Sequence, residues 1–200
     1  MTIADPSTSP SSESVPPAPE PDRPVSPPPA YGAWGEPRHK TVSWHDPLAT
    51  AARAATMSGL EFLRAMQNGE VPPPPIAAMF GFRPVGVEPG DVRFACVPDE
   101  SAYNPIGVVH GGLVCTLLDT AAACAVHSTL PAGVGYTSIE IKVNYLRPVR
   151  VEPGTPAELI THGWVTKPGR RVAFAEGDVR DGAGRVVATA STTCLVFPIA

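Results

Sequence analysis

Residues 110–130 read HGGLVCTLLDTAAACAVHSTL. From Leu113 to Leu130 this stretch contains helix-forming residues without proline or glycine, and apolar side chains lie on nearly every side of the predicted helix. A helix of this kind is buried either in protein or in a membrane. The carboxylate of Asp119 would be costly at the depth of a bilayer. The sequence therefore predicts a helix over 113–130 that is buried inside a folded domain.

The segments on both sides of this helix predict strands. Before it, Val85–Glu88 and Val92–Val97 flank a Pro89-Gly90-Asp91 turn and predict a hairpin. After it come four segments in which polar and apolar residues alternate: Tyr136–Tyr145, Pro156–Thr166, Arg171–Arg180 and Arg185–Phe197. Short turns between long strands predict an antiparallel meander with one face exposed to water.

The alternation is plainest in Tyr136–Tyr145. It predicts that Ile139, Ile141, Val143 and Tyr145 face one way and that the intervening polar residues face the other. Two helices are predicted before the hairpin, a peripheral one over Ser58–Asn68 and a single turn over Ile76–Phe80. A sheet of this size needs a helix against its apolar face. We therefore expect an α+β fold, with a curved antiparallel sheet of five to six strands around one long central helix.

Composition divides the chain and narrows its partners. Residues 1–40 are rich in proline and serine and poor in large aliphatic residues, so they predict a disordered tail before one domain over 41–200. The 15 basic and 19 acidic residues are mixed, which argues against nucleic-acid or membrane binding. No secretory signal is visible, and the four separated cysteines are predicted to be buried thiols. We expect a cytoplasmic protein that binds a small molecule or a second copy of itself.

Asp119 is the anomaly in the predicted central helix. A buried carboxylate needs a partner or a task, because burial of an unpaired charge is costly. Its helical neighbours Cys115, Thr116, Ala122 and Ala123 are small, which leaves room for a ligand or a second helix. The alternative is a structural Asp119 that is satisfied by a nearby hydroxyl or by water.

Glycines at the start of the same helix form the second candidate feature. Gly111 and Gly112 stand where unpaired N–H groups emerge at the positive end of the helix dipole, so a carbonyl or an oxyanion could approach the backbone. A tight turn is the other reading of this pair. His110 is either a cap or a base, and Asn104 either binds a ligand or closes an Asx turn. Eight residues of helix separate Gly111 from Asp119 by about 12 Å. If both act, they must act across a dimer.

The runs NPIGVVHGGLVCTLLD (104–119) and TSIEIKVNYLRP (137–148) resemble the hotdog-fold acyl-CoA thioesterases of the phenylacetate-pathway (PaaI-like) type. The resemblance extends from about residue 57 to residue 197. It implies a hotdog homodimer, often paired into a dimer of dimers, that hydrolyses acyl-CoA thioesters without a metal or a cofactor.

The resemblance also implies roles for individual residues. Asp119 matches the catalytic carboxylate, a nucleophile or general base, and the Gly111 N–H of the other subunit matches the donor to the thioester carbonyl. Asn104 matches a residue that places the carbonyl or the water, and His110 and Gly112 lie beside it. A hydroxyl from the next strand assists in some members. Thr137 fits the strand alternation and Ser138 fits the alignment, so both remain candidates.

Coenzyme A carries phosphates that a cation could bind. The candidates at the sheet edge are Arg147, Lys167, Arg170 and Arg171, although solvated charges at strand ends would look the same. Two other activities are compatible with such a chain. One is an acyl-thioester hydratase or dehydratase that uses His110 with Asp119, and the other is a noncatalytic acyl-CoA-binding protein.

Overall fold

The computed structural model describes residues 32–151 and 158–199 and divides the chain into two units, Met1–His39 and Lys40–Ala200. The predicted tail over 1–40 lies mostly outside the described residues. Within the described part of the first unit there is a short 3-10 turn, Gly32–Trp34. The helices of the second unit are α1 (Pro47–Ala55), α2 (Gly59–Gln67), α3 (Pro75–Phe80) and α4 (Gly111–His127). Its strands are β1 (Phe82–Glu88), β2 (Asp91–Cys96), β3 (Val134–Tyr145), β4 (Leu159–Lys167), β5 (Val172–Arg180) and β6 (Val186–Pro198).

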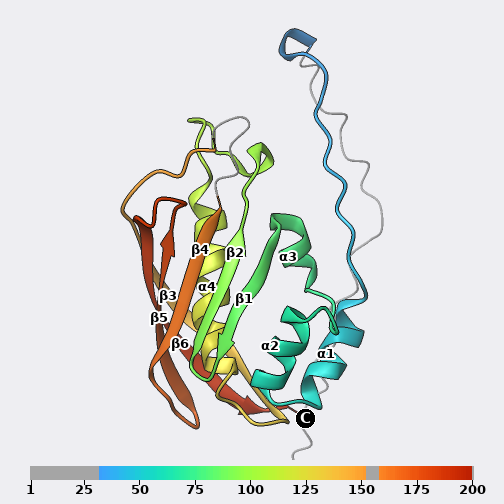
Figure 1. Ribbon diagram of the computed structural model, residues 1–200, viewed down its shortest axis with the longest axis vertical. Coiled ribbons are helices and arrows are strands. Elements are labelled where there is room, and N and C mark those ends of the chain that lie inside the picture. Colours follow the sequence, from blue (N-terminus) through green and yellow to red (C-terminus); the bar gives the residue numbers. More distant parts are fainter. Residues whose placement is uncertain (1–31, 152–157, 200) are drawn as a thin grey trace, which may run out of the picture. The chain divides into compact units, whose positions relative to one another are not determined.

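The six strands form one antiparallel sheet in the order β1-β2-β4-β5-β6-β3, and α4 lies across one face of it (Figure 1). The meander prediction is therefore correct for β4, β5 and β6 but wrong for β3, which pairs with β6 and forms a sheet edge. Turn residues in a sequence show where a strand ends and not which strand lies beside it. The predicted turn at 152–154, between β3 and β4, lies outside the described residues.

The buried core lies between α4 and the sheet. Leu117 and Leu118 are fully buried, as is Leu159 on β4. Strand β4 comes so close to the helix that a Cβ on Gly163 would lie 2.3 Å from the backbone of Ala121. This close approach requires glycine at position 163, because no backbone atom can move aside cheaply.

Both ends of α4 differ from the prediction of 113–130. The helix begins two residues earlier, since His110 caps it. It ends at His127, because the Ser128 and Thr129 hydroxyls donate to the Ala125 and Val126 carbonyls and compete with the helical pattern. Leu130 is buried but lies outside the helix.

The helix predicted over Ser58–Asn68 is present as α2. It is less peripheral than expected, since it buries Phe62 and Leu63. Its start is pressed against the end of α4, and the Gly59 N–H donates to the Leu130 carbonyl at 3.0 Å. Helix α1 was not predicted. Leu48 is its one large apolar residue and is exposed, so the segment has no row of large apolar side chains by which a helix is readily recognised in a sequence.

Ser58→Ala should lower the free energy of unfolding by about 1 kcal/mol, because Ser58 caps α2 and its side chain accepts the N–H of Glu61. Thermal unfolding checks this, with the exposed Ser43→Ala as the control. Equal melting temperatures for the two variants would show that the cap adds nothing.

All four cysteines are free. Cys96 and Cys194 are buried as predicted, whereas Cys115 and Cys124 are only half-buried. Within the described residues, no helix is both long and apolar enough to span a bilayer.

Candidate functional site

Asp119 lies in the third turn of α4 and faces β3. The Ser138 hydroxyl donates to its Oδ1 at 2.7 Å. The sequence predicted a buried Asp119, but within one chain its side chain is only half-buried. One carboxylate oxygen is thus held in place while the group still borders open space, into which a ligand or a second chain could enter.

A bulge in β3 determines which hydroxyl reaches Asp119. The pairing of β3 with β6 shifts between Ser138 and Glu140, so that Ile139 is the extra residue and is 57% exposed. The predicted alternation is therefore correct only beyond the bulge, where Ile141 and Val143 face the core. Before the bulge the faces are exchanged, so Ser138 points toward the helix while Thr137 is exposed.

Removal of the Ser138 hydroxyl by Ser138→Ala should lower the thioester hydrolysis that the family resemblance implies about tenfold, the loss expected for one hydrogen bond to a charged group. Thr137→Ala is the matched control and should stay within about twofold of wild type, since that side chain lies on the other face. Steady-state kinetics on the two purified variants test this. A larger loss for Thr137→Ala than for Ser138→Ala would refute the assignment.

His110 is the N-cap of α4, and its Nδ1 accepts the Gly112 N–H at 2.8 Å. Of the two roles considered for His110, a cap or a base, the structure shows the cap. The Gly112 N–H is therefore already occupied by His110. The Gly111 N–H, in contrast, donates to no acceptor among the described residues. One backbone donor at the positive end of the helix is therefore left for a ligand.

Tyr145 packs against Gly111, a contact that no pattern in the sequence indicates. Its hydroxyl donates to the Gly111 carbonyl at 2.9 Å, and a Cβ on Gly111 would lie 3.1 Å from its ring. The ring thus packs directly on the helix start.

Asn104 closes its own loop, as the Asx-turn alternative predicts. Its side-chain oxygen accepts the N–H groups of Ile106 at 3.1 Å and Val108 at 3.2 Å. The side-chain N–H₂ has no acceptor among the described residues and is the part of Asn104 that can meet a ligand.

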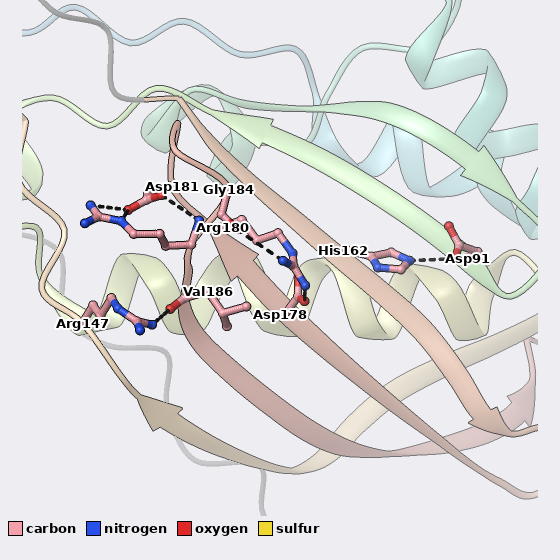
Figure 2. Close-up of polar contacts among 9 residues, drawn as sticks. Asp91, Arg147, His162, Asp178, Arg180, Asp181, Gly184 and Val186 are labelled. Atoms are coloured by element: carbon pink, nitrogen blue, oxygen red, sulfur yellow. Dashed lines mark hydrogen bonds and ion pairs between the residues drawn. The ribbon is translucent and has the colours of Figure 1, made fainter.

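A cleft of about 280 Å³ opens beside the helix start and is lined by Gly111, Tyr145 and Arg147 among others. Figure 2 shows the Arg147 side chain donating to the Val186 carbonyl. Arg147 is thus held at the end of α4 that carries the free N–H.

The four candidate cations do not form one cluster within the chain. Arg170 lines a separate groove with Thr129 and Pro131, just beyond the other end of α4. Lys167 lies over the ring of Phe174 at 5.7 Å, and Arg171 is exposed. Of the four, only Arg147 lies beside Gly111. In the described part of the chain no group of three His, Cys, Asp or Glu residues is placed to hold a metal ion.

A curved antiparallel sheet around one long helix defines a hotdog-fold protein. A family model described as the thioesterase superfamily matches residues 106–188. Human acyl-coenzyme A thioesterase 13 is 30% identical over 105 residues, which are 52% of this chain and 71% of that protein. The chain therefore belongs to the thioesterase superfamily.

Two further similarities agree with this membership. A Halobacterium salinarum protein named as an esterase is 42% identical over 72 residues, 35% of this chain and 44% of that protein. A solved phenylacetic acid degradation-related protein of Ralstonia eutropha JMP134 is 28% identical, with a TM-score of 0.60, over 66% of this chain and 98% of that one. The chain spans about half the length of the esterases that it matches.

Proposed function

We propose that this protein hydrolyses acyl-CoA thioesters to a free acid and coenzyme A, at a site shared by two copies of the chain. The observation that carries the proposal is the pairing of a positioned acid with a free donor. The Asp119 carboxylate is held by Ser138, and the Gly111 N–H is without an acceptor among the described residues. A thioester carbonyl is already a good electrophile, so a carboxylate and one oxyanion donor are enough for its hydrolysis.

The proposed reaction follows from these two groups. Asp119 acts either as a general base that takes a proton from water or as a nucleophile on the carbonyl carbon. The oxyanion that forms accepts the Gly111 N–H, and the carbon–sulfur bond breaks as the oxyanion collapses. If Asp119 is the base, the proton that it took from water passes to the thiolate of coenzyme A, and the free acid is released. If Asp119 is the nucleophile, the thiolate takes its proton from solvent, and water then hydrolyses the acyl–Asp119 anhydride, which releases the free acid and restores the carboxylate. Asn104 contributes its side-chain N–H₂ to the carbonyl or the water, and Arg147 meets a phosphate of coenzyme A.

The Gly111 N–H and the Asp119 carboxylate belong to different chains in this proposal, because about 12 Å of helix separates them within one chain.

Strand β3 is a long edge strand, and such an edge readily pairs with another chain. Ile139, Tyr145 and Leu146 are more than half exposed on or next to it. Half-buried Cys115, Thr116 and Asp119 give α4 a narrow face for a second helix. An antiparallel dimer through this edge and this face sets Gly111 of one copy beside Asp119 of the other. A dimer of dimers and a cytoplasmic location belong to the same proposal.

Relatives support the reaction class. Acyl-coenzyme A thioesterase 13 of human is named for this reaction and is 30% identical to this chain over 105 residues. Against a hydratase, the Nδ1 of His110 accepts the Gly112 N–H, so a neutral His110 ring carries its proton on Nε2 and offers no free nitrogen as a base. A noncatalytic binding protein has no need of a carboxylate held at the site.

Incubation with a panel of acyl-CoAs, with titration of free thiol, separates these functions. Thiol release supports the thioesterase. Loss of enoyl absorbance without thiol release would instead indicate a hydratase, and binding without either change would indicate a binding protein.

A further inference from the structure

We propose that the apolar cavity between α2, α3, β1 and α4 receives the acyl group and limits it to about six carbons. This inference rests on the proposed function and names the substrate class of the same site. The cavity lies within one chain and has a volume of about 170 Å³. Its walls are mostly apolar, with Phe62 and Met66 from α2, Ala77 from α3 and Phe82 from β1.

The cavity adjoins the carboxylate through two elements. On β3, Tyr136 lines the cavity while Ser138, two residues on and on the same face, donates to Asp119. Two residues of strand span about 7 Å. On α4, Thr120 and Cys124 line the cavity and follow Asp119 in the chain. An acyl group whose carbonyl lies at Asp119 can therefore extend along α4 into this space.

The electrostatics agree with this proximity. Burial raises the pKa of the Cys124 thiol to about 12, and the negative charge of Asp119 adds to the rise. Burial also raises the pKa of Tyr136 well above its usual range, again with a contribution from Asp119. Both side chains are thus close enough to the carboxylate to sense its charge.

The titratable side chains that line the cavity are all neutral near pH 7. His127 packs between Phe62 and Tyr136 with its ring tilted against both, at centroid distances of 5.9 and 5.0 Å, and burial lowers its pKa to about 4. With Cys124 and Tyr136 protonated as well, no charge in the cavity wall can pair with a carboxylate on the acyl group. The cavity therefore favours an uncharged, apolar acyl group over a dicarboxylic one.

Volume sets the size limit. An apolar cavity of about 150 Å³ holds benzene, so 170 Å³ accommodates about six carbons. Helices α2 and α3 form one wall of the cavity, and α2 is held in place by the hydrogen bond from the Gly59 N–H to the Leu130 carbonyl. A longer chain would have to displace these helices.

The test is a ladder of straight-chain substrates, butanoyl-, hexanoyl-, octanoyl- and dodecanoyl-CoA, with succinyl-CoA added. We expect kcat/KM to peak at hexanoyl-CoA and to be at least about tenfold lower for dodecanoyl-CoA and for succinyl-CoA. Met66→Ala enlarges the cavity and should raise the dodecanoyl-to-hexanoyl ratio at least about fivefold. Met79→Ala is the matched control, since Met79 is exposed on α3 and does not line the cavity.

The ratio is measured within one protein sample, so a partly unfolded variant does not change it. A wild-type preference for dodecanoyl-CoA, or an equal ratio in both variants, would overturn the inference. Absence of thiol release with every substrate would instead refute the proposed function. Calorimetric binding of the same ladder to Asp119→Asn then still tests the cavity, because tightest binding of hexanoyl-CoA is expected and a flat ladder would contradict it.

Discussion

Asp119→Asn is expected to lower thioester hydrolysis by at least about a hundredfold, the low end for loss of an acid–base or nucleophilic group. Asparagine has nearly the same shape, and its side-chain oxygen can still accept the Ser138 hydroxyl, which donates to Oδ1 at 2.7 Å. The melting temperature should therefore stay within about two degrees of wild type.

Thiol release and thermal unfolding on one preparation measure both quantities. Glu176→Gln is the control for the change from acid to amide, because Glu176 is exposed on the opposite face of the sheet. Wild-type turnover in Asp119→Asn would make the carboxylate a structural group.

Gly111→Pro should also cost about a hundredfold or more in turnover, since it deletes the N–H proposed to meet the oxyanion. Proline is well tolerated at the first position of a helix, where its missing N–H breaks no helical hydrogen bond. His110, the residue before it, has φ −64° and ψ 135°, and this is a conformation that the residue preceding a proline readily adopts. The fold should therefore survive.

Gly111→Ala is the matched variant for this experiment. It introduces the same Cβ beside the Tyr145 ring but keeps the N–H, so the ratio of the two turnover numbers isolates the donor. Equal losses in the two variants would show that the steric contact, and not the N–H, matters.

The central helix and most strands could be predicted because their patterns are local. An apolar run without a breaker predicts α4, and alternation predicts the strands. The bulge at Ile139 could not be predicted in this way, since one extra residue exchanges the faces of a strand without altering its composition. That single residue decides between Thr137 and Ser138.

Strand order was the second feature beyond the reach of the sequence. The position of β3 beside β6 depends on pairing between segments about fifty residues apart, which no local pattern records. The cavity could not be predicted either, because Phe62, Thr120 and Tyr136 are far apart in the sequence and come together only in the fold. The cap at His110 could not be decided from the sequence, since a histidine before two glycines is more often a cap but also fits a base.

The most direct test of a site shared by two chains is complementation between Gly111→Pro and Asp119→Asn. Asn104→Ala is less suitable, because the Asn104 side-chain oxygen closes its own loop. Each variant alone should be nearly inactive. After the two are unfolded, mixed and refolded together, about half of the dimers carry one chain of each kind, and in these one site has both the intact N–H and the intact carboxylate. Activity should recover to about a quarter of wild type if the sites are independent. Activity equal to the sum of the two residual rates, with mixed dimers confirmed by mass, would contradict a shared site.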